Sequence, residues 1–135
     1  MSVAEVKTLD QRRAQHAWQA IENLKKNYKK NDQETYAREA KKLPMRIMSA
    51  GLGQAMAFIR AKASDKPSLI QLHQDLTDWV FQGRKLSGKA PKSLLESIVR
   101  GNAVFLRRAT DEVLAYLEWL NRFAEAEIEV DITKE

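Results

Sequence analysis

Apolar residues recur at helical spacing near the start of the chain. Between Ala14 and Tyr28 the apolar positions advance in steps of 3, 4, 3 and 4 residues. This spacing keeps one face of a helix apolar, so that the face can pack against a core. The pattern predicts a helix over residues 9–29, with Thr8 or Asp10 as the N-cap that accepts a hydrogen bond from the first turn.

The last part of the chain carries the longest such pattern. From Leu106 to Ala124 the apolar positions advance in steps of 3, 4, 4, 3 and 4, which predicts a helix over residues 103–127. Shorter patterns predict further helices over residues 33–43, 44–50, 52–63, 67–83 and 91–100. No segment alternates apolar and polar residues as a half-buried strand does. The predicted fold is all-α: a single compact bundle of about six helices, counting the short ones, with a long C-terminal helix.

Two features set the predicted boundaries. Pro44 lacks a backbone N–H. We therefore predict that the helix over residues 33–43 ends there and that a separate short helical piece follows. After the last helix the sequence turns acidic. We therefore predict one helical domain over residues 1–128 and an acidic flexible tail over residues 129–135.

Two glycines lie close together where the sequence otherwise favours a helix. Each glycine inside a helix costs about 1 kcal/mol relative to alanine, so a compensating reason is expected. Gly51 suits a bend with positive φ, and Gly53 lies in a row of small residues that allows another backbone to approach. We predict close helix packing at Gly51 and Gly53. The approaching group could belong to the chain's own core, to a partner protein or to a nucleic-acid backbone.

Composition excludes several classes of function. The chain contains no cysteine, which excludes disulfides, thiolate metal sites and a cysteine nucleophile. That absence is typical of a reducing cytoplasm, the expected location. No apolar run approaches about 18 residues, so no membrane span is expected. The N-terminus lacks the apolar stretch of a signal peptide.

No pattern in the sequence indicates catalysis. Neither His16 nor His73 has a partner at metal-ligand spacing, and the segment around Gly51 is not a phosphate-binding loop. Asp75 and Asp78 lie three residues apart and could form a pair of acids, but we interpret them as solvated charges on a helix face. The sequence therefore predicts no enzyme, no metal site, no cofactor and no small-molecule substrate.

Charge is distributed unevenly along the chain. Residues 1–108 hold 21 basic and 10 acidic residues, a net charge of +11, whereas residues 109–135 hold 2 basic and 8 acidic residues, a net charge of −6. A basic body indicates an anionic partner such as nucleic acid, although solvated helix faces would also explain it. Trp18, Trp79 and Trp119 lie on or beside apolar rows, and we interpret them as core residues rather than as platforms for stacked bases.

Clusters of cations are the best candidates for a binding surface. The predicted RNA-backbone contacts are Lys25, Lys26, Lys29, Lys30, Lys41, Lys42, Arg46, Arg60 and Lys62. Because no aromatic RNA-recognition motif accompanies them, any contact is expected to be with phosphates and independent of base sequence. The loop over residues 84–92 is a further basic segment.

Three segments resemble one known family. They are "RRAQHAW" at 12–18, "GLGQAMAFIRAKA" at 51–63 and "ATDEVLAYLEWLNRFAEAEI" at 109–128. In this order they resemble the small subunit of the type III-B (Cmr-type) CRISPR RNA-guided effector complex. The resemblance implies a non-enzymatic helical protein of antiviral defence. It also implies contacts with backbone subunits, the large polymerase-like subunit and copies of itself, and a place beside the guide RNA and target RNA.

Two functions remain open at this point. The first is a scaffold subunit that adds a basic surface to the channel for guide and target RNA. The second is a protein–protein adaptor or self-associating module without direct RNA contact. In that second case the acidic end of one copy could pair with the basic body of another.

Overall fold

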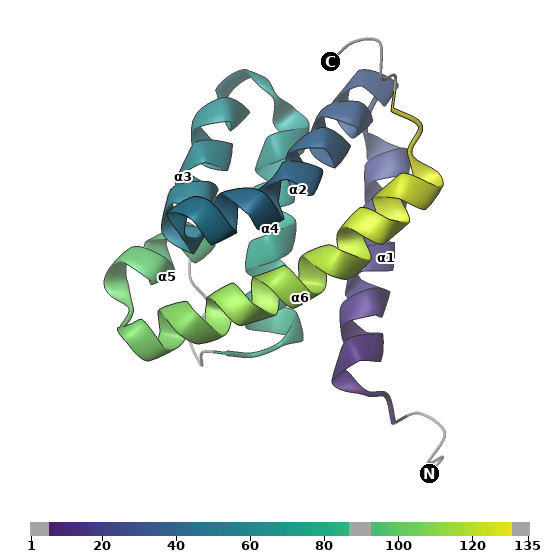
Figure 1. Cartoon of the computed structure of the whole chain (residues 1–135). Helices are drawn as coiled ribbons and strands as arrows, with labels where there is room; N and C mark the ends of the chain where they lie inside the picture. The colour runs from purple at the N-terminus through teal and green to yellow at the C-terminus, as the bar shows by residue number, and fades with distance from the viewer. Residues whose placement is uncertain (1–5, 87–92, 131–135) are drawn as a thin grey trace.

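The computed structural model describes residues 6–86 and 93–130, and the regular elements within them are all helical (Figure 1). The all-α prediction is confirmed. In chain order the elements are α1 (Leu9–Asn27), α2 (Lys30–Ala50), α3 (Leu52–Lys62), the short 3₁₀ turn η2 (Ala63–Asp65), α4 (Pro67–Asp78), the π-helical turn η3 (Trp79–Gly83), α5 (Leu94–Arg100) and α6 (Ala103–Glu127).

The two longest apolar patterns meet in the core. α6 packs along α1 and also crosses α2, while α3 and α4 form the other side of the bundle (Figure 1). The largest fully buried side chains are those of Trp79, Tyr36 and Tyr116, one each from η3, α2 and α6. Because these three elements contribute to one apolar interior, the bundle has a single connected core.

Several helices begin at a residue whose side chain accepts a hydrogen bond from a backbone N–H of the first turn. At α1 the Thr8 hydroxyl accepts from the backbone N–H of Gln11 at 3.0 Å, and the Gln11 side chain accepts from the N–H of Thr8 at 2.9 Å. This reciprocal pair is a capping box. Thr8, rather than Asp10, is therefore the cap. Asn102 caps α6 by accepting from the N–H of Phe105.

The predicted break at Pro44 is wrong, because α2 continues through it from Lys30 to Ala50. Proline cannot donate to the carbonyl four residues earlier, which leaves the oxygen of Ala40 without its helical partner. The side-chain amide of Asn121 on α6 donates to that oxygen at 3.0 Å. The neighbouring helix thus replaces the hydrogen bond that the proline removes.

The two glycines serve different purposes. Gly51 joins α2 to α3 with φ of +89°, and a Cβ there would meet no atom within 4 Å. The bend is confirmed, but close packing at Gly51 is wrong, since its backbone conformation is what requires glycine. A Cβ on Gly53 would lie 3.3 Å from Cγ2 of Ile98 on α5. The close approach at Gly53 is therefore made by the chain itself.

Two further expectations concern Trp18 and the end of the chain. The interpretation of Trp18 as a core residue is wrong, because its side chain is 41% exposed, although its ring packs against Phe123 of α6. The chain also stays packed beyond residue 128: Ile128 is buried and Val130 packs against the core. The acidic flexible tail over residues 129–135 stays a prediction, since residues 131–135 lie outside the described residues. No helix in the described part of the chain is long and apolar enough to cross a membrane.

Candidate functional site

Four of the predicted RNA-binding lysines gather at one corner of the molecule. Lys25 and Lys26 lie in the last turn of α1, Lys29 precedes α2 and Lys30 begins it, beside the C-terminal end of the described chain (Figure 1). We call these four residues the α1–α2 corner. Cations at the C-terminal end of α1 also offset its helix dipole, which favours lysine at positions 25 and 26 in any case.

Acidic residues at and after the end of α6 partly neutralise the α1–α2 corner. The Lys25 ammonium lies 3.0 Å from a carboxylate oxygen of Glu127, and the Lys30 ammonium lies 3.7 Å from one of Glu129. Lys26 and Lys29 are exposed and make no ion pair with a carboxylate in the described residues. The acidic end of the chain therefore contacts its own basic surface.

Three other predicted cations surround a buried carboxylate. The side chain of Glu39 is 6% exposed, and its oxygens lie 2.8 Å from the Lys62 ammonium, 3.1 Å from the Arg46 guanidinium and 3.8 Å from the Lys42 ammonium. Burial alone would raise the pKa of Glu39, but the bonds from Lys62 and Arg46 outweigh it and lower that pKa. These cations are therefore already engaged within the fold.

The last two predicted cations are separate from both groups. Lys41 is exposed on α2, and Arg60 is exposed near the end of α3. Neither makes an ion pair with a carboxylate that the structure describes. The exposed and unpaired members of the predicted set are thus Lys26, Lys29, Lys41 and Arg60. Of the loop predicted over residues 84–92, the part over residues 87–92 lies outside the described residues.

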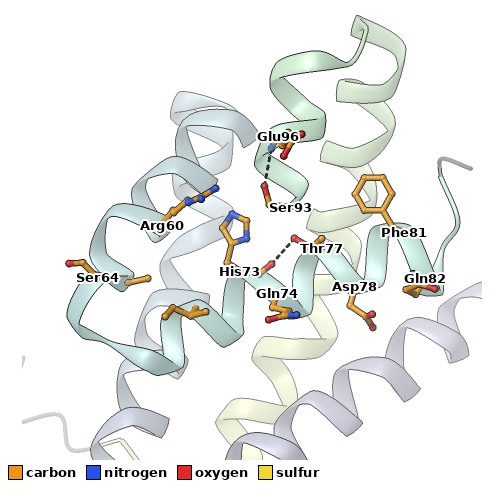
Figure 2. Close-up of a pocket in the computed structure, with 12 residues that line it drawn as sticks. Arg60, Ser64, His73, Gln74, Thr77, Asp78, Phe81, Gln82, Ser93 and Glu96 are labelled. Carbon is orange, nitrogen blue, oxygen red and sulfur yellow. Dashed lines mark hydrogen bonds between the residues drawn. The ribbon is translucent and has the colours of Figure 1, made fainter. Parts of the chain in front are cut away.

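A groove runs along the outer face of α4 and η3 (Figure 2). It encloses about 580 Å³ between the end of α3 and the start of α5. Arg60 lines one side, and Ser93 and Glu96 line the other. The floor is formed by Ile70, His73, Gln74, Thr77, Asp78 and Phe81. We call this cavity the α4 groove; nothing in the sequence pattern predicts it, since its walls come from three separate helices.

His73 is the most unusual residue of the α4 groove. It is 8% exposed, and its Nε2 atom is buried without a hydrogen-bond partner. In Figure 2 its ring points from α4 into the groove, toward the side on which Arg60 and Ser93 lie. Burial, and then the positive charge of Arg60, keeps the pKa of His73 below its ordinary value. The imidazole is therefore neutral at pH 7.

The interpretation of Asp75 as a solvated charge is wrong. Asp75 is 8% exposed and accepts hydrogen bonds from the Tyr36 hydroxyl at 2.7 Å and from the Gln71 amide at 2.8 Å. Burial raises its pKa to about 6. Asp78, by contrast, lies at the surface, where its carboxylate is 2.7 Å from Nε2 of His16. The two acids therefore point to different partners and form no catalytic pair.

Other buried polar groups also have structural partners. The Glu112 carboxylate accepts from Arg13 at 2.6 and 3.1 Å, from Trp79 at 3.0 Å and from Arg84 at 3.1 Å. Nδ1 of His16 lies 2.7 Å from the Tyr116 hydroxyl. Within residues 6–86 and 93–130, no group of three His, Cys, Asp or Glu side chains could hold a metal ion.

These contacts join two of the segments that carry the family resemblance. Arg13 and His16 come from the first segment, and Glu112 and Tyr116 come from the last. Sequence alone could not show this link, because the paired residues lie 99 and 100 positions apart. Side chains of the first and the last of these segments therefore hold α1 and α6 together.

Comparisons with known proteins identify the family. The model for the CRISPR-associated protein family Cas_Cmr5 matches residues 9–127. The protein described as CRISPR system Cmr subunit Cmr5 from Thermus thermophilus is 32% identical over 113 residues, which are 84% of this chain and 92% of that protein. The crystal structure of a CRISPR-associated Cmr5 family protein from the same organism is 31% identical. It covers 91% of this chain and 100% of that chain, with a TM-score of 0.72. The chain thus belongs to the Cmr5 family of CRISPR-associated proteins, which confirms the resemblance in its sequence.

Proposed function

We propose that this chain is the small, non-catalytic helical subunit of a CRISPR Cmr effector complex. In that complex it contacts neighbouring subunits and adds a basic surface to the channel for guide and target RNA. Family membership supports a place in such a complex, since the relative from Thermus thermophilus is described as a Cmr subunit. The RNA contact rests on the electrostatics of the described surface.

The observation that carries the RNA contact is the set of unpaired lysines. Lys26 and Lys29 of the α1–α2 corner and Lys41 on α2 are exposed, with no carboxylate of the described chain bound to them. Phosphate contacts require exposed cations and no particular base, so these lysines suit a channel that holds strands of any sequence. Lys25 and Lys30 can join them, because exposed ion pairs are weak and exchange readily with other anions.

The polar interior supports a scaffold role rather than catalysis. Hydrogen bonds to side chains of other helices engage the polar groups of His16, Asp75 and Glu112. These groups therefore stabilise the packing of the helices. An effect of this chain on RNA would then come from position and charge. The purified chain is expected to bind single-stranded RNA weakly and to leave it uncleaved.

The triple variant Lys26→Glu, Lys29→Glu and Lys41→Glu tests this function. In a complex reconstituted with the variant, we expect the chain to be incorporated normally and target RNA to be captured less tightly. For the isolated chain, each lost phosphate contact lowers the slope of log affinity against log salt by about 0.7, so the slope is expected to fall by about 2. The measurement is RNA binding by fluorescence anisotropy across a salt series.

A matched control reverses the same number of charges elsewhere. Lys66, Arg107 and Arg108 are exposed, and none makes an ion pair with a described carboxylate. Their replacement by glutamate is expected to change RNA capture much less than the test variant does. If the test variant instead abolishes incorporation and leaves RNA binding unchanged, the adaptor function is correct and the RNA-facing surface is not.

A further inference from the structure

We propose that the α4 groove is the docking site for a segment of a neighbouring protein subunit that presents an acidic side chain, whose carboxylate binds Arg60 and His73. This inference rests on the proposed function, because it assumes that the chain is assembled with other subunits. It separates two surfaces of the molecule: the α1–α2 corner for RNA and the α4 groove for protein.

The shape of the groove suits a segment of polypeptide. Its floor runs along one helix face from Ile70 to Gln82, a length of about 18 Å at the rise of a helix. The end of α3 and the start of α5 border it on two sides (Figure 2). Ile70 is 56% exposed and Phe81 also lines the groove, so the floor has an apolar residue near each end and polar residues between them. A mixed lining of this kind is typical of protein interfaces.

The charges of the groove indicate an anionic group on the partner. Its two carboxylates already have partners: Asp78 lies 2.7 Å from Nε2 of His16, and Glu96 lies 3.5 Å from the Arg100 guanidinium. Arg60 is the one lysine or arginine that lines the groove, and no carboxylate of the described chain binds it. A carboxylate placed beside the Arg60 guanidinium would form a charge-assisted hydrogen bond.

His73 indicates where that carboxylate would be bound. A buried polar atom without a partner destabilises the free chain, and a group that hydrogen-bonds to it on binding removes that cost. The neutral imidazole can donate one hydrogen bond from Nε2. Since His73 and Arg60 line the same cavity, one carboxylate could accept from both side chains.

The same charges disfavour an RNA strand in the groove. A strand carries a negative charge at every phosphate and would pass Asp78 and Glu96 on its way along the floor. A protein segment can instead present a single carboxylate and flank it with neutral or apolar side chains. The observations therefore favour protein over RNA as the occupant.

Two variants test the proposal in the reconstituted complex. Arg60→Glu reverses the unpaired charge, and His73→Leu removes the imidazole while keeping a similar volume. In competition with the unmodified chain, each is expected to be incorporated at least about tenfold less well, the loss typical of removing a buried charge-assisted bond at an interface. The melting temperature of His73→Leu is expected to be unchanged or higher, because the variant loses an unsatisfied buried atom.

The control is Lys66→Glu, an equal charge change at an exposed residue near α4 that does not line the groove. It should be incorporated like the unmodified chain. If both groove variants also are, the groove proposal is wrong while the proposed function stands. If Arg60→Glu lowers the affinity of the isolated chain for labelled single-stranded RNA about tenfold, the groove belongs to RNA and the proposal is overturned. If the unmodified chain itself fails to assemble, the proposed function falls and the groove proposal with it.

Discussion

At the scale of single residues, buried carboxylates divide into two kinds. Glu39 and Glu112 are surrounded by cations, which lower the pKa of each below its ordinary value despite burial. Asp75 has only neutral donors, from Tyr36 and Gln71, and burial raises its pKa to about 6. The first kind stabilises the fold when ionised, whereas the second destabilises it when ionised.

This difference predicts the pH dependence of Asp75→Asn. A raised pKa means that the fold favours protonated Asp75, so its ionisation lowers the free energy of unfolding as the pH rises through about 6. From about pH 5 to about pH 7.5 the unmodified chain is expected to lose about 1 kcal/mol more stability than the variant, which has no group to ionise. Urea denaturation across this range measures it.

Between about pH 5 and about pH 7.5, ionisation of Glu39 and Glu112 contributes little to the change in stability. Because the pKa values of Glu39 and Glu112 lie below the ordinary 4.5, their stabilising contribution is complete above that pH and is lost only as the pH falls lower. Parallel stability curves for Asp75→Asn and the unmodified chain would show that Asp75 ionises in the folded chain as easily as in the unfolded one.

At the scale of helices, α2 shows how a neighbour can override a local rule. Pro44 should end a helix, yet α2 continues because Asn121 of α6 donates to the carbonyl of Ala40. The Oδ1 atom of Asn121 is itself buried without a partner, so the amide is held in place at some cost. The hydrogen bond to Ala40 is therefore expected to be worth more than a typical surface bond.

A double-mutant cycle measures this replacement. Asn121→Ala alone is expected to cost about 1–3 kcal/mol of unfolding free energy, because it leaves the buried Ala40 carbonyl unsatisfied. In the background Pro44→Ala, residue 44 regains an N–H that can donate to that carbonyl, so Asn121→Ala should cost much less there. A coupling energy near zero would show that Asn121 acts through packing and not through this hydrogen bond.

The junction between α2 and α3 gives a second prediction at this scale. Gly51→Ala has open space for its methyl group but must adopt φ of +89°, which costs about 1–3 kcal/mol. Gly53→Ala meets Cγ2 of Ile98 at 3.3 Å but gains helix propensity, so its net effect is expected to lie within about 1 kcal/mol of zero. Thermal unfolding of the two variants compares them. A larger loss at Gly53 would mean that α5 cannot shift to admit a methyl group.

At the scale of the whole molecule, local spacing in the sequence predicts some features and misses others. The all-α fold and the bend at Gly51 could be predicted because they depend on periodicity and backbone preference. The exposure of Trp18, the continuity at Pro44 and the burial of Asp75 could not, since each depends on a helix that lies far away in the chain. For the candidate site, spacing locates the lysines but cannot show that Glu127 and Glu129 pair with two of them.

Because of that pairing, acidic residues near the end of the chain neutralise part of the basic surface of the same chain. Glu127 at the end of α6 and Glu129 after it contact the α1–α2 corner, where they would compete with an RNA phosphate for Lys25 and Lys30. Removing the competing carboxylates should therefore strengthen RNA binding if this corner faces RNA. The double variant Glu127→Gln and Glu129→Gln tests this while leaving Ile128 and its buried contacts in place.

For Glu127→Gln with Glu129→Gln, we expect tighter binding of single-stranded RNA at low salt. Two freed lysines can each add a phosphate contact, which would steepen the slope of log affinity against log salt by about 1.4. Anisotropy titrations of the isolated chain measure it. The control Asp111→Asn with Glu118→Gln raises the net charge equally but frees no lysine, because neither exposed acid has an ion pair among the described residues. An equal gain in both variants would reflect net charge alone, whereas a gain confined to the first pair assigns the RNA contact to the α1–α2 corner.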